Sequence, residues 1–357
     1  MKRLEEQKEK LIWHDPKKEP FIISGFAWFQ AEKKYRRLPS EPDWEIPDIV
    51  SRLADCTAGG QIRFQTNAKT IAVKVKLSGK ADMSNMPATG QCGFDCYIGP
   101  AGQKHFINIT RYEPTLQEYE LPFFEREGTD FLPITLNFPL YQGVEEVLVG
   151  VNEGAVISEP APFDSGRKII LYGTSILQGG CASRPGMAYT NIISRKLNLE
   201  SINLGFSGSG RGEPNMAKII RTIENPACLV LDYEPNCVST ELYKKTLPEF
   251  IRIYRETHPY VPIILVSKFP YAAEAVDRQL YEDRIARLVF QKNLVQELQQ
   301  KGDQNITFIE GTNMLGEYTN EATVDGVHPT DLGFIKMAEY LGPVIAEAVS
   351  SGTEEQV

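Results

Sequence analysis

The stretch that decides the fold of the second half of this chain is KIILYGTSILQGG, residues 168–180. Its first five residues are nearly all apolar, which is typical of a strand that is covered on both faces. The glycine and the two small hydroxyl residues that follow interrupt this apolar run. The sequence therefore predicts a buried strand whose carboxyl end leads into a loop that carries Ser175.

Further apolar runs share this character and alternate with segments of helical period. They lie at residues 201–204, 228–232, 262–266 and 306–309. After them, apolar residues recur every three or four positions from Leu332 to Val349, which predicts a final amphipathic helix. Alternating strands and helices favour a mostly parallel sheet with helices on both faces. We expect a three-layer α/β/α domain of the flavodoxin-like type over residues 166–350.

The first part of the chain has a different periodicity. Its apolar and polar residues alternate with period two in short runs, which are separated by clusters of Gly, Pro and Asn. The runs lie at residues 61–65, 70–77, 94–98, 105–110 and 134–151. This pattern predicts an all-β sandwich, jelly-roll-like, over residues 1–160. The loop at residues 158–167, rich in proline and small residues, marks the boundary between the two domains.

Length, charge and apolar runs exclude several classes of protein. A chain of 357 residues exceeds the usual size of one core, which favours two domains. The net charge of -9 is spread along the chain and offers no basic stripe, so we expect no nucleic-acid partner. The charged segment from Met1 to Lys10 lacks the apolar stretch of an export signal, so we expect a cytoplasmic protein. No apolar run approaches the roughly 20 residues that span a membrane.

Cysteine and histidine spacing gives no indication of a metal site. The six cysteines contain no CxxC pair, and the chain is large enough to fold without disulfides. The four histidines are far apart, and none stands in a spacing typical of zinc ligands. We expect reduced thiols, no metal and no cofactor.

Candidate catalytic groups follow several of the predicted strands. Ligands of open α/β sheets bind outside the carboxyl ends of the strands. The segments at those ends are GTSILQGG (173–180), GFSGSG (205–210) and YEPN (233–236). Together they supply hydroxyl, amide and backbone donors of the kinds that acyl transfer uses.

The segment DGVHP, residues 325–329, stands directly before the final helix. Pro329 favours an extended conformation at His328. The three-residue spacing lets Asp325 reach Nδ1 of His328 and fix its tautomer, which leaves Nε2 free to accept a serine proton. The segment therefore predicts a general base together with the carboxylate that orients it.

These segments together resemble the four sequence blocks of the SGNH (GDSL-like) hydrolases, in the same order. The resemblance implies that Ser175 is the nucleophile and that His328 acts as general base and then as general acid, with Asp325 as its partner. It also implies an oxyanion hole formed by the amides of Ser175 and Gly208 and the side chain of Asn236. Two blocks depart from the common pattern: GTS replaces GDS, and YEPNC replaces GxND.

A second resemblance concerns the first half. GFDCY, residues 93–97, is similar to the GxDLY signature of a β-sandwich domain that precedes some SGNH hydrolase domains. The run after the nucleophile, residues 179–189, also resembles those two-domain relatives. Arg184 in this run is a candidate for binding a substrate carboxylate or sugar hydroxyls through its fork of donors.

The resulting hypothesis is a serine esterase that hydrolyses a small acyl ester, with acetyl as the expected acyl group, on a carbohydrate or similar polyol. The reaction would pass through an acyl-enzyme on Ser175. An acyltransferase with the same acyl-enzyme and a non-catalytic carbohydrate-binding protein remain alternatives. A flavodoxin-like module that holds a phosphate is less favoured, because few glycines or hydroxyls follow Ser175. We expect a small-molecule or glycan ester as the partner, and the sequence leaves homo-oligomerisation open.

Overall fold

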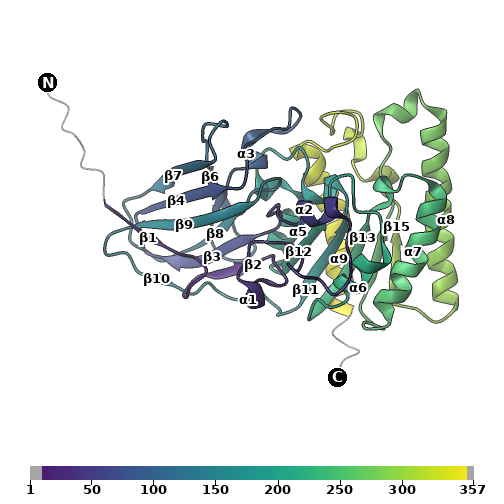
Figure 1. Cartoon of the computed structure of the whole chain (residues 1–357), viewed down its shortest axis with the longest axis horizontal. Coiled ribbons are helices and arrows are strands. Elements are labelled where there is room, and N and C mark those ends of the chain that lie inside the picture. Colours follow the sequence, from purple (N-terminus) through teal and green to yellow (C-terminus); the bar gives the residue numbers. More distant parts are fainter. Residues whose placement is uncertain (1–9, 352–357) are drawn as a thin grey trace.

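The computed structural model describes residues 10–351 of the chain. An antiparallel β half is followed by a half in which strands and helices alternate (Figure 1). The expectation about the charged segment from Met1 to Lys10 lies outside the described residues, apart from Lys10. No helix in the described part of the chain combines the length and the apolarity that crossing a bilayer requires.

The first half contains two antiparallel sheets. One has the order β1 (Leu11–His14), β9 (Val144–Asn152), β4 (Thr70–Leu77) and β7 (Glu118–Glu125). The other has the order β10 (Ile157–Ser158), β3 (Gln61–Thr66), β8 (Leu132–Asn137), β5 (Asp95–Ile98) and β6 (His105–Ile109), and β2 (Ile22–Ser24) pairs with β3. The alternating run at residues 134–151 is therefore two strands rather than one. Strand β7 is not among the predicted runs, and it contains Pro122. A proline is tolerated there because β7 is an edge strand.

Both antiparallel sheets contribute to one apolar core. Ile62 and Phe64 of β3 belong to the same buried cluster as Val73 and Val75 of β4, together with Phe138 from the turn after β8. Alternate residues of each strand thus face a shared interior, as period-two alternation predicts. The jelly-roll connectivity of this half stays a prediction.

The second half is built on a five-stranded parallel sheet, which confirms the parallel sheet predicted from the sequence. Its order is β12 (Glu200–Gly205), β11 (Lys168–Gly173), β13 (Pro226–Asp232), β14 (Ile263–Val266) and β15 (Ile306–Ile309). This is the 2-1-3-4-5 order of flavodoxin-like sheets, in which ligands bind at the carboxyl edge beside the first and third strands. The loops after β11 and β13 therefore lie where such sheets place their sites.

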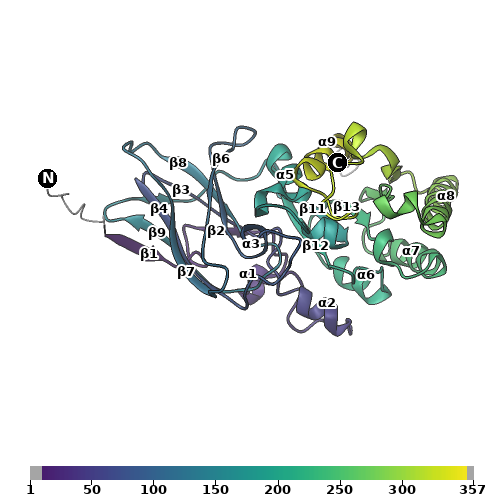
Figure 2. The ribbon, with the colours of Figure 1, turned by 90° about the horizontal axis from the view of Figure 1, so that it is seen from above.

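Helices cover both faces of this sheet (Figure 2). One face carries α5 (Tyr189–Leu197) and α9 (Asp331–Ser351), and the other carries α6 (Pro214–Ile220), α7 (Thr240–Arg255) and α8 (Arg278–Gln300). Along β11, Ile169 and Leu171 face the first helix layer, whereas Ile170 and Tyr172 face the second. Both faces of the strand are buried, which explains why its sequence is continuously apolar rather than alternating.

Short helices complete the described residues. They are α1 (Phe29–Glu32), α2 (Asp48–Leu53), α3 (Ala88–Gln91), α4 (Ser175–Gln178), η1 (Pro185–Met187), η2 (Glu234–Asn236), η3 (Ala272–Ala275), η4 (Gly311–Asn313) and η5 (Gly316–Tyr318).

A segment before β3 packs on the second half rather than on the first. Val50 of α2 belongs to the core beneath α6 and α7. Arg37, which is 1% exposed, donates hydrogen bonds to the carbonyls of Asn203 and Gly205 at the carboxyl end of β12. The two halves are thus joined by packing and hydrogen bonds as well as by the chain between them. The domain ranges drawn from the sequence stay a prediction.

Candidate active site

Ser175 lies at the tight turn where β11 ends and α4 begins. Thr174 is the N-cap of α4, and its Oγ1 accepts a hydrogen bond of 3.2 Å from the Ile176 amide. A Cβ on Gly173 would lie 2.3 Å from the carbonyl oxygen of Asp232, so the turn requires glycine there. Aspartate and threonine both serve as N-caps. The departure from the common GDS block therefore leaves the capping role filled.

The structure brings Ser175 and His328 together across the sheet edge. Ser175 Oγ lies 2.9 Å from Nε2 of His328. On the other side of the ring, Nδ1 lies 2.8 Å from Oδ2 of Asp325. Oδ1 of Asp325 accepts hydrogen bonds from the amides of Val327 and His328, and Gly326 takes the positive φ of 84° that this tight loop needs. The three side chains form the hydrogen-bonded relay expected from the sequence.

Asp325 is held in its ionised form. Partial burial acts against the carboxylate, but hydrogen bonds from the backbone and ring of His328 and from Asn85 outweigh it. They lower the pKa of Asp325 to about 2. An ionised Asp325 keeps the imidazole proton on Nδ1, so Nε2 faces Ser175 as an acceptor.

Asn85 is a site residue that sequence reasoning missed. Its Nδ2 donates a hydrogen bond of 2.9 Å to Oδ2 of Asp325. Asn85 belongs to the loop between β4 and α3, so it reaches the relay from the antiparallel half of the chain. A single asparagine in a polar loop carries no periodic or spacing signal, and nothing in the sequence indicated this contact.

Gly208 and Ser175 each present an amide at the carboxyl edge of the sheet. Gly208 is exposed and has a φ of 65°, and an added Cβ would meet nothing within 4 Å. Its conformation, rather than crowding, therefore favours glycine. Within residues 10–351, neither amide donates a hydrogen bond to another protein group. Both are thus available to a ligand.

Asn236 follows β13 at the end of η2. Its Nδ2 donates a hydrogen bond of 3.0 Å to the carbonyl of Phe206, next to the Gly208 turn. The Phe206 amide in turn donates to the carbonyl of Gly173, two residues before Ser175. A primary amide carries two N–H donors, so the Phe206 contact leaves one for a ligand. These bonds hold the loops after β11, β12 and β13 to one another.

Comparison with known protein families shows to which family this chain is related. A model of the GDSL-like lipase/acylhydrolase family matches residues 166–346, just over half of the chain. The chain belongs to this family. A second model, for the GxDLY N-terminus of SGNH hydrolase-type esterases, matches residues 11–157. The two matches agree with the order of the two sequence resemblances.

Several solved structures share this fold. A GDSL-like lipase from Bacteroides ovatus superposes with a TM-score of 0.87 at 29% identity, covering 96% of this chain and 98% of the other. Salicylyl-acyltransferase SsfX3 from a tetracycline biosynthetic pathway gives 0.76 at 19% identity, covering 92% and 95%. A family two carbohydrate esterase from Cellvibrio japonicus gives 0.61 at 14% identity, covering 96% and 99%. No curated protein gives a significant match.

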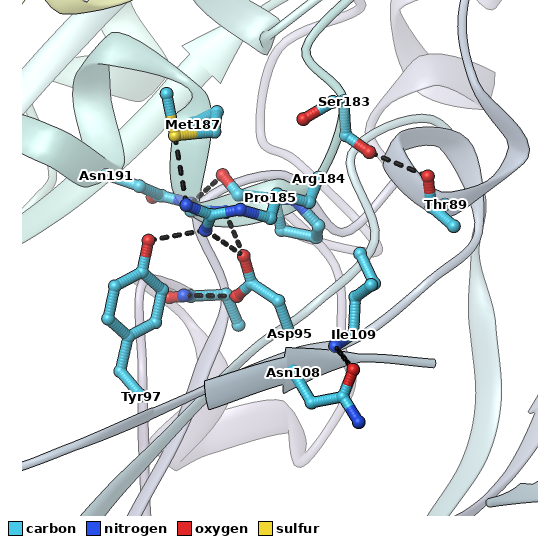
Figure 3. Close-up of polar contacts among 12 residues, drawn as sticks. Thr89, Asp95, Tyr97, Asn108, Ile109, Ser183, Arg184, Pro185, Met187 and Asn191 are labelled. Carbon is cyan, nitrogen blue, oxygen red and sulfur yellow. Dashed lines mark hydrogen bonds and ion pairs between the residues drawn. The ribbon is translucent and has the colours of Figure 1, made fainter. Parts of the chain in front are cut away.

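In this GDSL-like acylhydrolase, Arg184 makes contacts that the sequence analysis did not anticipate (Figure 3). Its guanidinium lies 3.0 Å from Oδ2 of Asp95, donates to the hydroxyl of Tyr97, and stacks 3.7 Å from the ring centroid of Phe106. Asp95 is fully buried and also accepts a hydrogen bond of 2.7 Å from the Gly186 amide. A buried carboxylate needs such partners. The guanidinium also lies 3.1 Å from the sulfur of Met187 in the α/β half, so its donors contact protein groups of both halves. The substrate-binding role of Arg184 stays a prediction.

The loop after Ser175 and α4 also contacts the start of α9. The Thr89 hydroxyl donates a hydrogen bond of 2.7 Å to the carbonyl of Ser183 (Figure 3). The Ser183 amide donates one of 2.9 Å to Oδ1 of Asp331, three residues beyond His328. One loop thus contacts the antiparallel half on one side and the histidine segment on the other.

A cluster of three candidate metal ligands adjoins the relay. Among residues 10–351, ligand atoms of Cys181, Asp325 and His328 all lie within 4.8 Å of one another. No spacing in the sequence indicates this cluster, because Cys181 is distant in the chain from the other two residues.

Proposed function

We propose that this chain is a serine esterase that removes a small acyl group, with acetyl the expected one, from a carbohydrate or similar polyol. The single observation that carries the reaction type is the 2.9 Å contact between Ser175 Oγ and His328 Nε2. A serine hydroxyl is a weak nucleophile until a neighbouring base takes its proton. His328 is within reach of that proton, and Asp325 holds it in the tautomer that can accept it.

The proposed reaction has two steps. In the first, His328 takes the Ser175 proton while Oγ attacks the ester carbonyl, and the tetrahedral oxyanion accepts hydrogen bonds from the amides of Ser175 and Gly208 and from Asn236. The intermediate collapses as His328 returns the proton to the leaving alcohol, which leaves the acyl group on Oγ. In the second step, His328 deprotonates a water molecule that attacks the acyl-enzyme and releases the acid. Preorganised donors of this kind are usually the largest contribution to such catalysis.

The proposed substrate rests on the architecture. The fold extends over nearly the whole length of a family two carbohydrate esterase, including its first half. We therefore infer an acetylated saccharide or polyol as the ester. The exposed Gly208 turn beside the nucleophile is compatible with a bulky alcohol group.

The direct test uses purified full-length chain with p-nitrophenyl acetate and with acetylated oligosaccharides. We expect turnover of both, and we expect Ser175→Ala to abolish it while circular dichroism shows an unchanged fold. Ser158→Ala, which alters a serine on β10 away from the sheet edge, is the matched control and should retain full activity. Equal activity in Ser175→Ala would remove Ser175 from the mechanism.

Acyl transfer is the second candidate, favoured by the fold shared with a salicylyl-acyltransferase. Its first step is the same, and an acceptor alcohol replaces water in the second. Mass spectrometry after incubation with an ester donor and excess polyol separates the two: a new ester product supports transfer, and free acid alone supports hydrolysis. Binding of acetylated glycans without either product would indicate the non-catalytic alternative.

A further inference from the structure

The thiol of Cys181 lies beside the catalytic relay but has no role in the proposed reaction. Its sulfur, an Asp325 carboxylate oxygen and a His328 ring nitrogen are mutually within 4.8 Å. Cys181 has a φ of 73°, a left-handed conformation that residues other than glycine seldom adopt. Such backbone conformations persist only where the surroundings fix them, and they are concentrated at functional sites.

A surface cavity is lined in part by Cys181. Its volume is about 620 Å³, and its lining combines residues from both halves of the chain: Asn85, Cys181, Ser183, Val324 and Asp331 are among them. Of the three residues of this cluster, only Cys181 is part of that lining, and Ser175 is not. The cavity therefore leads an ion to the sulfur of Cys181, which lies within 4.8 Å of the other two ligand atoms.

We propose that Cys181, Asp325 and His328 form a binding site for a thiophilic divalent cation, Zn²⁺, and that occupation of this site inhibits the hydrolase. Zn²⁺ prefers thiolate sulfur, imidazole nitrogen and carboxylate oxygen, and three protein ligands with one open position are a common zinc arrangement. The binding part of the proposal stands on the cluster alone, and the inhibition part rests on the proposed function.

The positions of two protons explain why a bound ion would inhibit ester hydrolysis. Nδ1 is the ring nitrogen that lies 2.8 Å from Asp325, so a Zn²⁺ bound by both residues would take the Nδ1 lone pair and leave the ring proton on Nε2. The imidazole would then present a donor instead of an acceptor to Ser175 and could not take the serine proton. The thiol of Cys181 would release its proton to solvent on ligating the metal.

The first experiment measures binding without any use of activity. Co²⁺, a spectroscopic substitute for Zn²⁺, is titrated into the Ser175→Ala variant of the full chain. We expect a thiolate-to-cobalt charge-transfer band that Zn²⁺ displaces, that Cys181→Ser removes, and that Cys56→Ser, the matched control at another free thiol, retains. Absence of the band, or its survival in Cys181→Ser, would overturn the site. Cys181→Ala serves if the serine variant fails to fold.

The second experiment measures inhibition in the otherwise unaltered enzyme. Zn²⁺ should suppress p-nitrophenyl acetate turnover, and a chelator should restore it. The Cys181→Ser variant should turn over substrate and require at least about tenfold more Zn²⁺ for half inhibition, because even outer-shell losses weaken metal sites by 10 to 100-fold. Unchanged zinc sensitivity in that variant would overturn the proposal. A cobalt band in a protein that shows no ester turnover would support the metal site and contradict the proposed esterase activity.

Discussion

Asn85 and His328 donate to the same oxygen, Oδ2 of Asp325, at 2.9 and 2.8 Å. One donor comes from the antiparallel half and the other from the α/β half. The relay is therefore completed only when the two halves are docked. The first half therefore contributes a hydrogen bond to the carboxylate that contacts His328.

Asn85→Asp should impair catalysis in a pH-dependent manner. A second carboxylate in contact with Asp325 would raise the pKa of one member of the pair, because two like charges at this distance resist joint ionisation. Asp325 keeps its hydrogen bonds from His328, so the raised pKa belongs to the new carboxyl at position 85, which can donate to Asp325 as Asn85 does until it ionises. We expect the ratio of kcat/KM in the variant to that in the wild type to fall as the pH rises through this raised pKa.

Asn85→Ala is the matched comparison, because it removes the donor without adding charge. We expect a loss in kcat on the order of tenfold with little change in KM, consistent with the typical value of a hydrogen bond to a charged group. The ratio of kcat/KM in Asn85→Ala to that in the wild type should not vary with pH. Equal pH profiles for the two variants would contradict the charge argument.

Asn236→Ala should slow turnover by roughly a hundredfold or more in kcat, which is the typical cost of losing one oxyanion donor. Steady-state kinetics with p-nitrophenyl acetate checks this, and KM should change much less than kcat. Asn236→Asp is the shape-matched control: it keeps the volume but replaces the donor with an acceptor, so it should be at least as impaired. Activity near that of the wild type in Asn236→Asp would remove the side chain from the oxyanion hole.

Asp95→Ala should destabilise the whole chain by about 3 kcal/mol or more, because it leaves the Arg184 guanidinium partly buried without its counter-charge. The side chain of Asp95 is 0% exposed and that of Arg184 is 17% exposed. Urea unfolding provides the measurement. Residues in one ion pair are energetically coupled, so the double variant Asp95→Ala/Arg184→Met should lose less than the sum of the single losses. Additive losses would show that the two side chains act independently.

Asp232 should make the stability of the fold fall as the pH rises towards neutrality. Burial, with the charge of Glu234, raises the pKa of Asp232 from 3.8 to about 7, although the hydrogen bond from Tyr189 opposes this. Between these values the unfolded chain releases a proton that the folded chain retains, so unfolding becomes more favourable with rising pH. Asp232→Asn should flatten this dependence. The measurement is the free energy of unfolding of the wild type and of Asp232→Asn across this pH range. The same pH dependence in both proteins would contradict the role of Asp232.

Much of the α/β half could be predicted because its signals are local. The five parallel strands are short apolar runs, and β11, β14 and β15 begin and end within one residue of their predicted bounds. Asp325 and His328 are three residues apart, so their contact depends on one loop. The antiparallel half was harder, since β7 contains a proline and the run at residues 134–151 conceals a turn.

The order of the candidate groups along the chain can be read from the sequence: a serine after the first parallel strand, a glycine turn after the second, an asparagine after the third, and an Asp-x-x-His segment before the last helix. Three contacts are visible only in the folded chain: Asn85 donates to Asp325, Arg184 pairs with Asp95, and Cys181 lies close to Asp325 and His328. Periodicity and short spacings record what a residue's neighbours in the chain require. Contacts between distant loops depend on how two separately patterned halves pack, and no local pattern encodes that packing.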